Sequence, residues 1–186
     1  MKRLLVLLVA CKSNSAPPPP PPPPPAPPSA THDAAINSTL APEPAAADLC
    51  DAYDRGGVVD ILGWKGMQKV SANGLKNGER RERHCAYRAL DKEATFGIAF
   101  STDKTFLPHH AGFDITYAKR DKVDGMDAWI GRNKEMVSLQ LVTHGIRIMT
   151  TLAKSGTPEE MEPRLVEATK KLVASMPADP LPMMHK

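Results

Sequence analysis

The chain has 186 residues, of which 41% are hydrophobic, only 5% are aromatic and 19 are prolines. Its formal net charge is +3, which becomes +1 if Lys2 and Arg3 leave with a signal peptide. A protein so close to neutral lacks the strong basic surface that nucleic-acid binding requires, so we expect no nucleic-acid partner. The low aromatic content predicts a mainly aliphatic core.

The N-terminus has the pattern of an export signal. Lys2 and Arg3 precede a short apolar run, residues 4–10, whereas a membrane-spanning helix needs roughly 20 residues. A basic start, a short apolar run and small residues before a cleavage point are typical of signal peptides. Leu8-Val9-Ala10-Cys11 resembles the bacterial lipobox. This resemblance implies that residues 1–10 are a lipoprotein signal peptide and that Cys11 is the site of lipid attachment.

Acylation of Cys11 predicts an exported, extracytoplasmic protein that is anchored to the cell membrane or the outer membrane. One alternative is a wrongly assigned start. Another is a short amphiphilic N-terminus with a buried Cys11. The complete signal pattern favours the lipid anchor.

A proline-rich segment follows the lipobox. Pro17–Pro25 are nine consecutive prolines, and such runs form polyproline II with a rise of about 3.1 Å per residue, which gives a semi-rigid rod of about 28 Å. We therefore predict that residues 11–47 are the lipidated cysteine and a disordered stalk that holds a domain away from the membrane. A ligand for a polyproline-binding domain is the alternative, but the segment lacks flanking basic residues.

Cys50 and Cys85 are the remaining cysteines. Two thiols of one domain in an oxidising compartment most simply form one structural disulfide. A redox or metal-binding pair is the alternative. The sequence lacks a C-x-x-C motif, and the neighbouring His84 would point to the opposite face of a strand from Cys85. We predict a Cys50–Cys85 disulfide, and neither a metal nor a cofactor.

The first part of the domain is expected to be helical. Asp48 is a suitable N-cap for a helix over residues 48–53, which Gly56-Gly57 should end. Val58–Leu62 predicts a second short helix, with Gly63 at its C-terminus.

Several strands are expected next. Asn73-Gly74 and Asn77-Gly78 are turn dipeptides. Arg80–Ala89 alternates like a strand whose buried face carries Cys85 and Tyr87, with its arginines at a solvated outer end. Residues 95–100 and 125–131 predict two further strands.

The stretch after the strand at residues 95–100 is hard to interpret, and residues 105–122 are its least regular part. Ser101-Thr102-Asp103-Lys104 matches the S-x-x-K pattern of penicillin-recognising enzymes, but the partner motifs of those enzymes are missing. His109-His110 is a candidate metal site with only two ligands, whereas metal sites need three or four. We predict a polar surface loop at His109-His110, and the alternation of Phe113, Ile115 and Tyr117 suggests a strand after it.

The end of the domain has the clearest patterns. Met136–Thr143 and Ile146–Ala153 predict a hairpin around His144-Gly145, in which Leu141 lies opposite Ile148. Thr157-Pro158-Glu159-Glu160 predicts the capping box of a final helix. Its regular part is expected to begin near Pro163. Residues 48–177 then form one globular domain, and residues 178–186 a tail.

The order of these features resembles a family of bacterial lipoproteins of unknown function, common in actinobacteria, whose two-cysteine α+β domain is similar to the PsbP-like fold. The resemblance covers roughly residues 46–176 and implies that Cys50 and Cys85 are the family's disulfide cysteines. Tyr87 departs from the family pattern, in which a tryptophan is common after the cysteine. We expect an α+β fold with an antiparallel meander sheet, packed in a sandwich-like way by N-terminal and C-terminal helices.

Two classes of function stay open. The first is a non-catalytic envelope lipoprotein that binds an envelope protein, a polymer or a small ligand, and a concave apolar pocket would favour it. The second is an envelope hydrolase or metal-dependent enzyme, which requires at least two histidines to meet a carboxylate. The candidate residues for that site are His84, His109, His110, His144, Asp103 and Asp114. We predict the binding protein.

Overall fold

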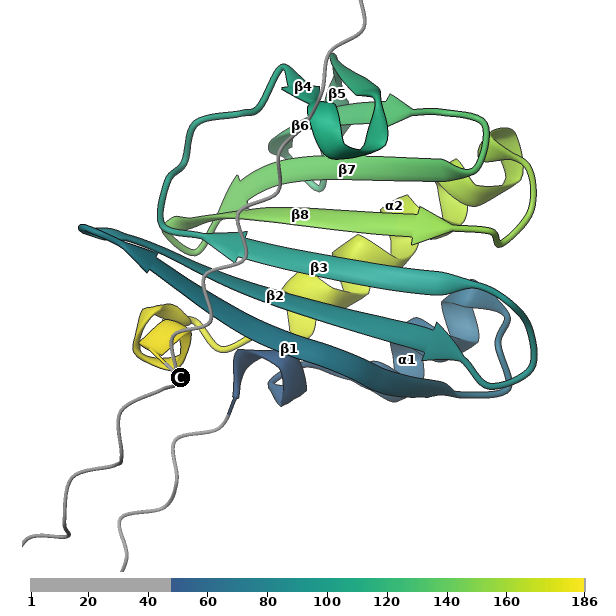
Figure 1. Cartoon of the computed structure of the whole chain (residues 1–186), viewed down its shortest axis with the longest axis horizontal. Coiled ribbons are helices and arrows are strands. Elements are labelled where there is room, and N and C mark those ends of the chain that lie inside the picture. The colour runs from purple at the N-terminus through teal and green to yellow at the C-terminus, as the bar shows by residue number, and fades with distance from the viewer. Residues whose placement is uncertain (1–47, 186) are drawn as a thin grey trace, which may run out of the picture. The chain divides into compact units, whose positions relative to one another are not determined.

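The computed structural model describes residues 48–185, which form an α+β domain with a curled antiparallel sheet (Figure 1). This part of the chain holds eight strands and two α-helices. The strands are β1 (Met67–Asn77), β2 (Arg80–Ala89), β3 (Thr95–Ser101), β4 (His109–His110), β5 (Ile115–Val123), β6 (Met126–Arg132), β7 (Met136–Thr143) and β8 (Ile146–Ala153). The helices are α1 (Arg55–Leu62) and α2 (Pro158–Ser175), with 3-10 helices η1 (Leu49–Asp51), η2 (Ala111–Phe113) and η3 (Leu181–His185). The expected α+β class with an antiparallel sheet is confirmed.

The sheet is not one continuous meander. Its strand order is β1-β2-β3-β8-β7-β6-β5-β4, so the chain forms one meander from β1 to β3 and a second from β4 to β8. The two meanders join where β3 pairs with β8 over seven residues, from Thr95 opposite Ala153 to Ser101 opposite Arg147. The connection from β3 to β4, residues 102–108, therefore spans from the middle of the sheet to its far edge.

The predicted hairpin is confirmed with its register. Thr143 lies opposite Ile146, and Leu141 lies opposite Ile148. The chain turns at His144 and Gly145, which both have positive φ, as a two-residue hairpin turn requires. The strand from Arg80 to Ala89 also has the predicted bounds.

Two predictions near the start of the domain are wrong, namely a turn at Asn73-Gly74 and a helix end at Gly56-Gly57. Asn73-Gly74 lies inside β1, where Gly74 is opposite Arg83. Gly56-Gly57 lies in the first turn of α1, because the side chain of Asp54 caps this helix and accepts a hydrogen bond of 2.9 Å from the Gly57 N–H. The caps at Asp48 and Gly63 are as predicted, although Asp48 begins a 3-10 helix.

Helix α2 covers one face of the sheet and runs diagonally behind it in Figure 1. It begins at Pro158 rather than near Pro163, because the Thr157 and Glu160 side chains form the predicted capping box and hold its first turn. Its apolar stripe packs on β7 and β8, and α1 packs against it. Within residues 48–185, no helix combines the length and apolar character that crossing a bilayer requires.

The C-terminal segment packs on the domain. Its η3 helix contacts β2, and Met184 is buried in the core. The predicted tail therefore contributes apolar surface to the described domain.

Candidate functional site

The face of the sheet opposite α2 carries no helix of the described domain longer than the single turn η2, and we call it the helix-free face (Figure 1). Because side chains alternate along a strand, the residues between the core positions of β2, β3, β8 and β7 point to this face. Many of them are small or polar. In β2, β3 and β8 they include Ala86, Gly97, Ala99, Ser101, Arg147, Met149 and Thr151.

The helix-free face is hollowed into one groove. A central pocket of about 350 Å³ shares Thr95, Phe113 and Met136 with a pocket of about 520 Å³ at one end. At the other end it shares four residues with a smaller pocket of about 130 Å³. Those four are His84, Ala99, His110 and Met149. The groove therefore runs along the strands from Arg147 to Ala153.

The centre of the groove is mainly apolar. Ala86, Gly97 and Ala99 form a floor without large side chains, and Phe113 and Met136 lie at its side. A Cβ atom on Gly97 would lie 2.4 Å from Oγ1 of Thr151 on the neighbouring strand. Glycine at this position therefore leaves the space that the Thr151 hydroxyl occupies beside β3.

The smaller pocket, which we call the polar end, contains charged side chains. Nε of Arg80 donates to Oε1 of Glu82 at 2.9 Å, and Nε2 of His84 lies 3.2 Å from the other carboxylate oxygen. Burial raises the pKa of Glu82, but the hydrogen bonds from Arg80 and His84 outweigh it and lower this pKa below its ordinary value. Arg80 also lies 3.6 Å from Asp103. Glu82 is thus an ionised carboxylate whose charge is already compensated.

A connecting segment, residues 102–114, forms one wall of the groove. Its Leu107 exchanges two hydrogen bonds of 3.0 Å with the side-chain amide of Gln140, which is fully buried. The guanidinium of Arg147 donates to the carbonyl oxygen of Thr105. The Phe106 ring stacks on Trp129 with centroids 5.3 Å apart. These contacts attach the segment to the helix-free face and place His110 and Phe113 beside the groove.

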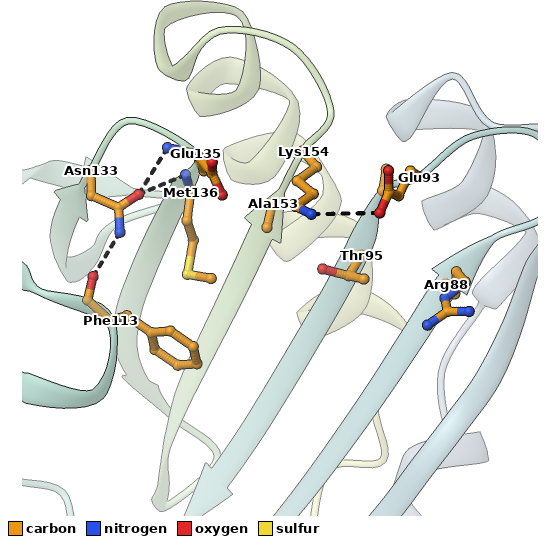
Figure 2. A pocket seen from close by; sticks show the side chains of 10 residues that line it. Arg88, Glu93, Thr95, Phe113, Asn133, Glu135, Met136, Ala153 and Lys154 are labelled. Atoms are coloured by element: carbon orange, nitrogen blue, oxygen red, sulfur yellow. Dashed lines mark hydrogen bonds and ion pairs between the residues drawn. The ribbon is translucent and has the colours of Figure 1, made fainter.

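The far end of the groove has compensated charges and an apolar corner. Figure 2 shows the side chains of Phe113 and Met136 pointing toward the same space. The amide of Asn133 fixes this corner, because it donates to the carbonyl oxygen of Phe113 at 2.6 Å. Lys154 and Glu93 pair across the opening at 3.6 Å. Phe113 is 45% exposed, so its ring lies at the surface of the groove rather than in the core.

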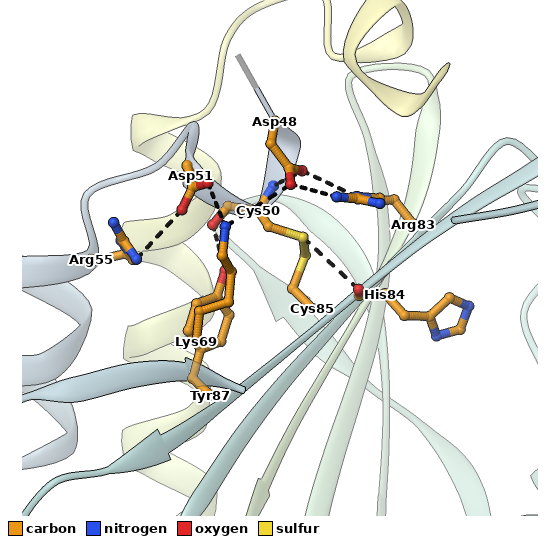
Figure 3. Close-up of a disulfide and its surroundings, with 9 residues drawn as sticks. All are labelled: Asp48, Cys50, Asp51, Arg55, Lys69, Arg83, His84, Cys85 and Tyr87. Carbon is orange, nitrogen blue, oxygen red and sulfur yellow. Dashed lines mark hydrogen bonds and ion pairs between the residues drawn. A yellow bond between two sulfur atoms is a disulfide. The ribbon is translucent and has the colours of Figure 1, made fainter. Parts of the chain in front are cut away.

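The predicted disulfide is present. Cys50 and Cys85 are bonded, with Cα atoms 5.7 Å apart, and the bond ties η1 to β2 behind the sheet (Figure 3). His84 points away from Cys85, as the alternation along the strand predicted. The prediction of a solvated arginine end is wrong for Arg83, which is buried. Its Nε donates to Oδ1 of Asp48 at 3.0 Å, so Asp48 is both an N-cap and the partner of this arginine.

The structure brings together two of the four candidate histidines. His84 and His110 both line the polar end with Glu82. His109 is exposed and contacts Thr116, and His144 lies at the β7–β8 turn beside the carbonyl oxygen of Ala178. In the described range, no three of the His, Cys, Asp and Glu side chains are placed to hold a metal ion.

Sequence reasoning missed the groove. A usable signal was present, because β2 and β3 both place small residues between their core positions, including Ala86, Gly97 and Ala99. Cys11, the predicted lipid-attachment site, lies outside the described residues. No protein-family model matches the chain, and neither a curated protein nor a solved structure matches it. A function for this protein must therefore be inferred from the geometry of the groove and from the predicted signal peptide.

Proposed function

We propose that this protein is a non-catalytic envelope lipoprotein, anchored through Cys11, that presents a ligand-binding α+β domain on a proline-rich stalk. The observation that supports a binding function is the apolar groove on the helix-free face. Ligand sites are typically concave and mainly apolar, with a few polar groups that fix orientation. The central pocket of about 350 Å³, with the polar end beside it, has this character.

The side chains that point into the groove, such as Ala86, Ala99 and Met149, are not part of the buried hydrophobic core. The core lies between the sheet and α2, and it is built from the opposite side chains of the same strands. In β3, for example, Phe96, Ile98 and Phe100 are buried against the helices, whereas Gly97 and Ala99 line the groove. An uncovered concave surface of this kind in a small domain favours a binding role.

The membrane anchor and the stalk rest on the sequence of residues 1–47. A lipidated Cys11 would retain the domain at the membrane, and the proline run would separate the two. We extend the proposal to the fold and suggest that the sheet and helices are a variant of the sandwich-like, PsbP-like domain of the bacterial lipoproteins that the sequence resembles. In that arrangement one layer of helices leaves the second face of the sheet available.

Filling the groove tests the binding function. We would purify the full chain from the envelope of its host and record native mass spectra for bound molecules. Ala99→Leu extends a side chain from the floor of the groove, so it should remove an adduct that the unaltered protein carries. Ala118→Leu is the matched control, because Ala118 is exposed on β5 and does not line the groove. An adduct that survives Ala99→Leu would mean that the ligand binds elsewhere.

Labelling tests the anchor separately. Cells that produce the chain are grown with labelled palmitate, and the label and the membrane fraction are followed. Replacing Cys11 with alanine should abolish both the label and the retention in the membrane fraction. Incorporation of label into Cys11→Ala would show that the lipobox assignment is wrong.

A second function, an envelope hydrolase, is favoured by one observation, which is that His84, His110 and Glu82 share the polar end. In a hydrolytic triad the histidine lies between the nucleophile and the carboxylate. Here Glu82 lies in the middle, 3.4 Å from the Ser101 hydroxyl and 3.2 Å from His84. This order supports binding better than catalysis. The full chain can be assayed for hydrolysis of nitrophenyl esters. Activity that is lost in the His84→Ala variant would support the enzyme instead.

A further inference from the structure

A buried cation in the groove indicates the chemistry of the ligand. Arg147 lies on the helix-free face of β8, is only 5% exposed, and lines the polar end. Its hydrogen bond to the carbonyl oxygen of Thr105 pairs one of the five N–H donors of a guanidinium with a neutral acceptor. Among the side chains that the structure describes, no carboxylate forms an ion pair with Arg147.

The acidic groups near Arg147 are paired with other side chains. Glu82 binds Arg80 and His84, and Asp103 caps the backbone N–H of Thr105 and lies beside Arg80. Both carboxylates attract the guanidinium from a distance, but burial outweighs them and lowers the pKa of Arg147. The charges that face this pocket are therefore one compensated cluster and one guanidinium without a counter-ion.

The donors of Arg147 remain accessible. Among the described side chains, Arg147 has no fully enclosed polar atom that lacks a hydrogen-bond partner. Its unused N–H groups therefore face the open space of the polar end. Buried charges are normally paired, and guanidinium binds carboxylates and phosphates through two parallel hydrogen bonds. A pocket of about 130 Å³ has room for one such group.

The apolar part of the groove begins at the same place. His84, Ala99, His110 and Met149 line both the polar end and the central pocket. From Arg147 to Ala153 the groove follows β8 for about 20 Å at the rise of a strand. A ligand whose anionic group reaches Arg147 must therefore place the rest of its structure over Ala86, Gly97 and Ala99. This floor is apolar, so it favours an apolar group over a polar one.

We propose that the groove binds an amphiphile with one anionic head group, a carboxylate or a phosphate monoester, held by Arg147, and an unbranched apolar chain lying toward Phe113 and Met136. This inference rests on the proposed binding function and specifies its ligand. Arg80, His84 and His110 would border the head group. Carboxylate and phosphate share the chemistry that a guanidinium recognises, and the experiment separates them.

The test is a calorimetric titration of the full, oxidised chain with four probes that share one alkyl chain: dodecanoate, dodecyl phosphate, dodecanol and dodecyltrimethylammonium. Because all four are tested on the unaltered protein, the result does not depend on whether a variant folds. We expect at least one of the two anions to bind about 30-fold more tightly than dodecanol, which corresponds to a charged hydrogen bond. We expect the ammonium probe to be the weakest. Whichever anion binds more tightly identifies the head group.

Two variants locate the head group. Arg147→Gln should reduce the preference for the anion over dodecanol to about 3-fold or less. Arg55→Gln, on helix α1 and outside the groove, should leave the preference unchanged. Equal affinities for dodecanol and both anions would overturn the inference, although a groove-binding function could stand. Acetate or inorganic phosphate that binds as tightly as the dodecyl probes would overturn the apolar part of it. If none of the probes binds, the amphiphile is wrong, and the adduct experiment with Ala99→Leu still decides the proposed function.

Discussion

The two faces of the sheet are built from alternate residues of the same strands, yet they differ in chemistry. The face under α2 is apolar, and its few buried polar contacts include a hydrogen bond of 2.7 Å between Thr150 and Thr169. The helix-free face buries Tyr117, Ser138, Gln140 and Arg147. Burial of Tyr117 raises its pKa, which the hydrogen bond to Ser138 only partly opposes, so it is a neutral donor at every physiological pH.

If the groove binds a ligand as we propose, this difference separates the face that stabilises the fold from the face that binds. Apolar burial is roughly proportional to area and needs no special geometry, so it suits the face that holds the fold together. Buried polar groups need defined partners. On the helix-free face those partners are the segment 102–114 and, in our proposal, the ligand. Changes on the helix-covered face should therefore affect stability most, and changes on the helix-free face should affect binding most.

The largest effect is expected from the disulfide behind the sheet. Reduction of the Cys50–Cys85 bond, which spans 35 residues, should lower the free energy of unfolding by about 4 kcal/mol because it frees the unfolded chain. Urea denaturation with and without reductant measures this change. The double variant Cys50→Ala, Cys85→Ala is the control for the reductant itself. A loss below about 1 kcal/mol would mean that η1 is held to β2 by other contacts alone.

The next effect compares two apolar residues of the central strands. Leu139 is fully buried under α2, so Leu139→Ala should cost about 3 kcal/mol through lost burial and a cavity. Met149 lies in the groove and is partly exposed, so Met149→Ala should cost about 1 kcal/mol or less. Thermal and urea unfolding of both variants test the contrast. Equal costs would show that the groove residues belong to the core.

Acid should weaken the ion pair between Asp48 and Arg83. Burial raises the pKa of Asp48, but hydrogen bonds from Arg83 and the Cys50 N–H and the charges of Arg83 and Lys69 together lower it below 3.8. A carboxyl whose pKa is lower in the folded state stabilises the fold at pH values above its unfolded-state pKa. This contribution is lost as the pH falls through the folded-state pKa. We expect Asp48→Asn to cost about 2 kcal/mol at pH 7 and much less below about pH 3.

The pH dependence of urea midpoints tests this prediction. Asp127→Asn is the control, because Asp127 forms an exposed pair with Lys122 at 3.2 Å, and such pairs contribute little. The interpretation would be contradicted if Asp48→Asn had the same cost at pH 3 as at pH 7.

The smallest effect on stability is expected at the attachment of residues 102–114. Gln140→Ala removes both hydrogen bonds to Leu107, and it should cost about 1 kcal/mol because water can replace part of them. Hydrogen exchange at the Leu107 amide should become faster, while exchange in α2 should not change. Gln68→Ala, at an exposed position of β1, is the control. Unchanged exchange at Leu107 would show that Phe106 and Arg147 suffice to hold the segment.

Local patterns predicted much of the fold. The hairpin register was correct because one pairing buries the apolar residues of both strands, including Leu141 and Ile148. The capping box of α2 was correct because Thr157 and Glu160 interact within one turn. β1 was missed because it is a polar edge strand that contains Asn73-Gly74, and a turn dipeptide outweighs weak alternation in a sequence.

The sequence by itself determined the alternation of β2, the caps of the helices and the pairing of the two cysteines, because these depend on neighbours along the chain or on the count of thiols. Only the tertiary structure decided that β3 pairs with β8, and this pairing places Gly97 beside Thr151 and Ala99 beside Met149. It also decided that residues 102–114 fold over the helix-free face and bury Arg147. Alternation of apolar and polar residues shows that a strand has two faces, but it does not show which distant segments cover each face. The groove depends on which segments cover the helix-free face.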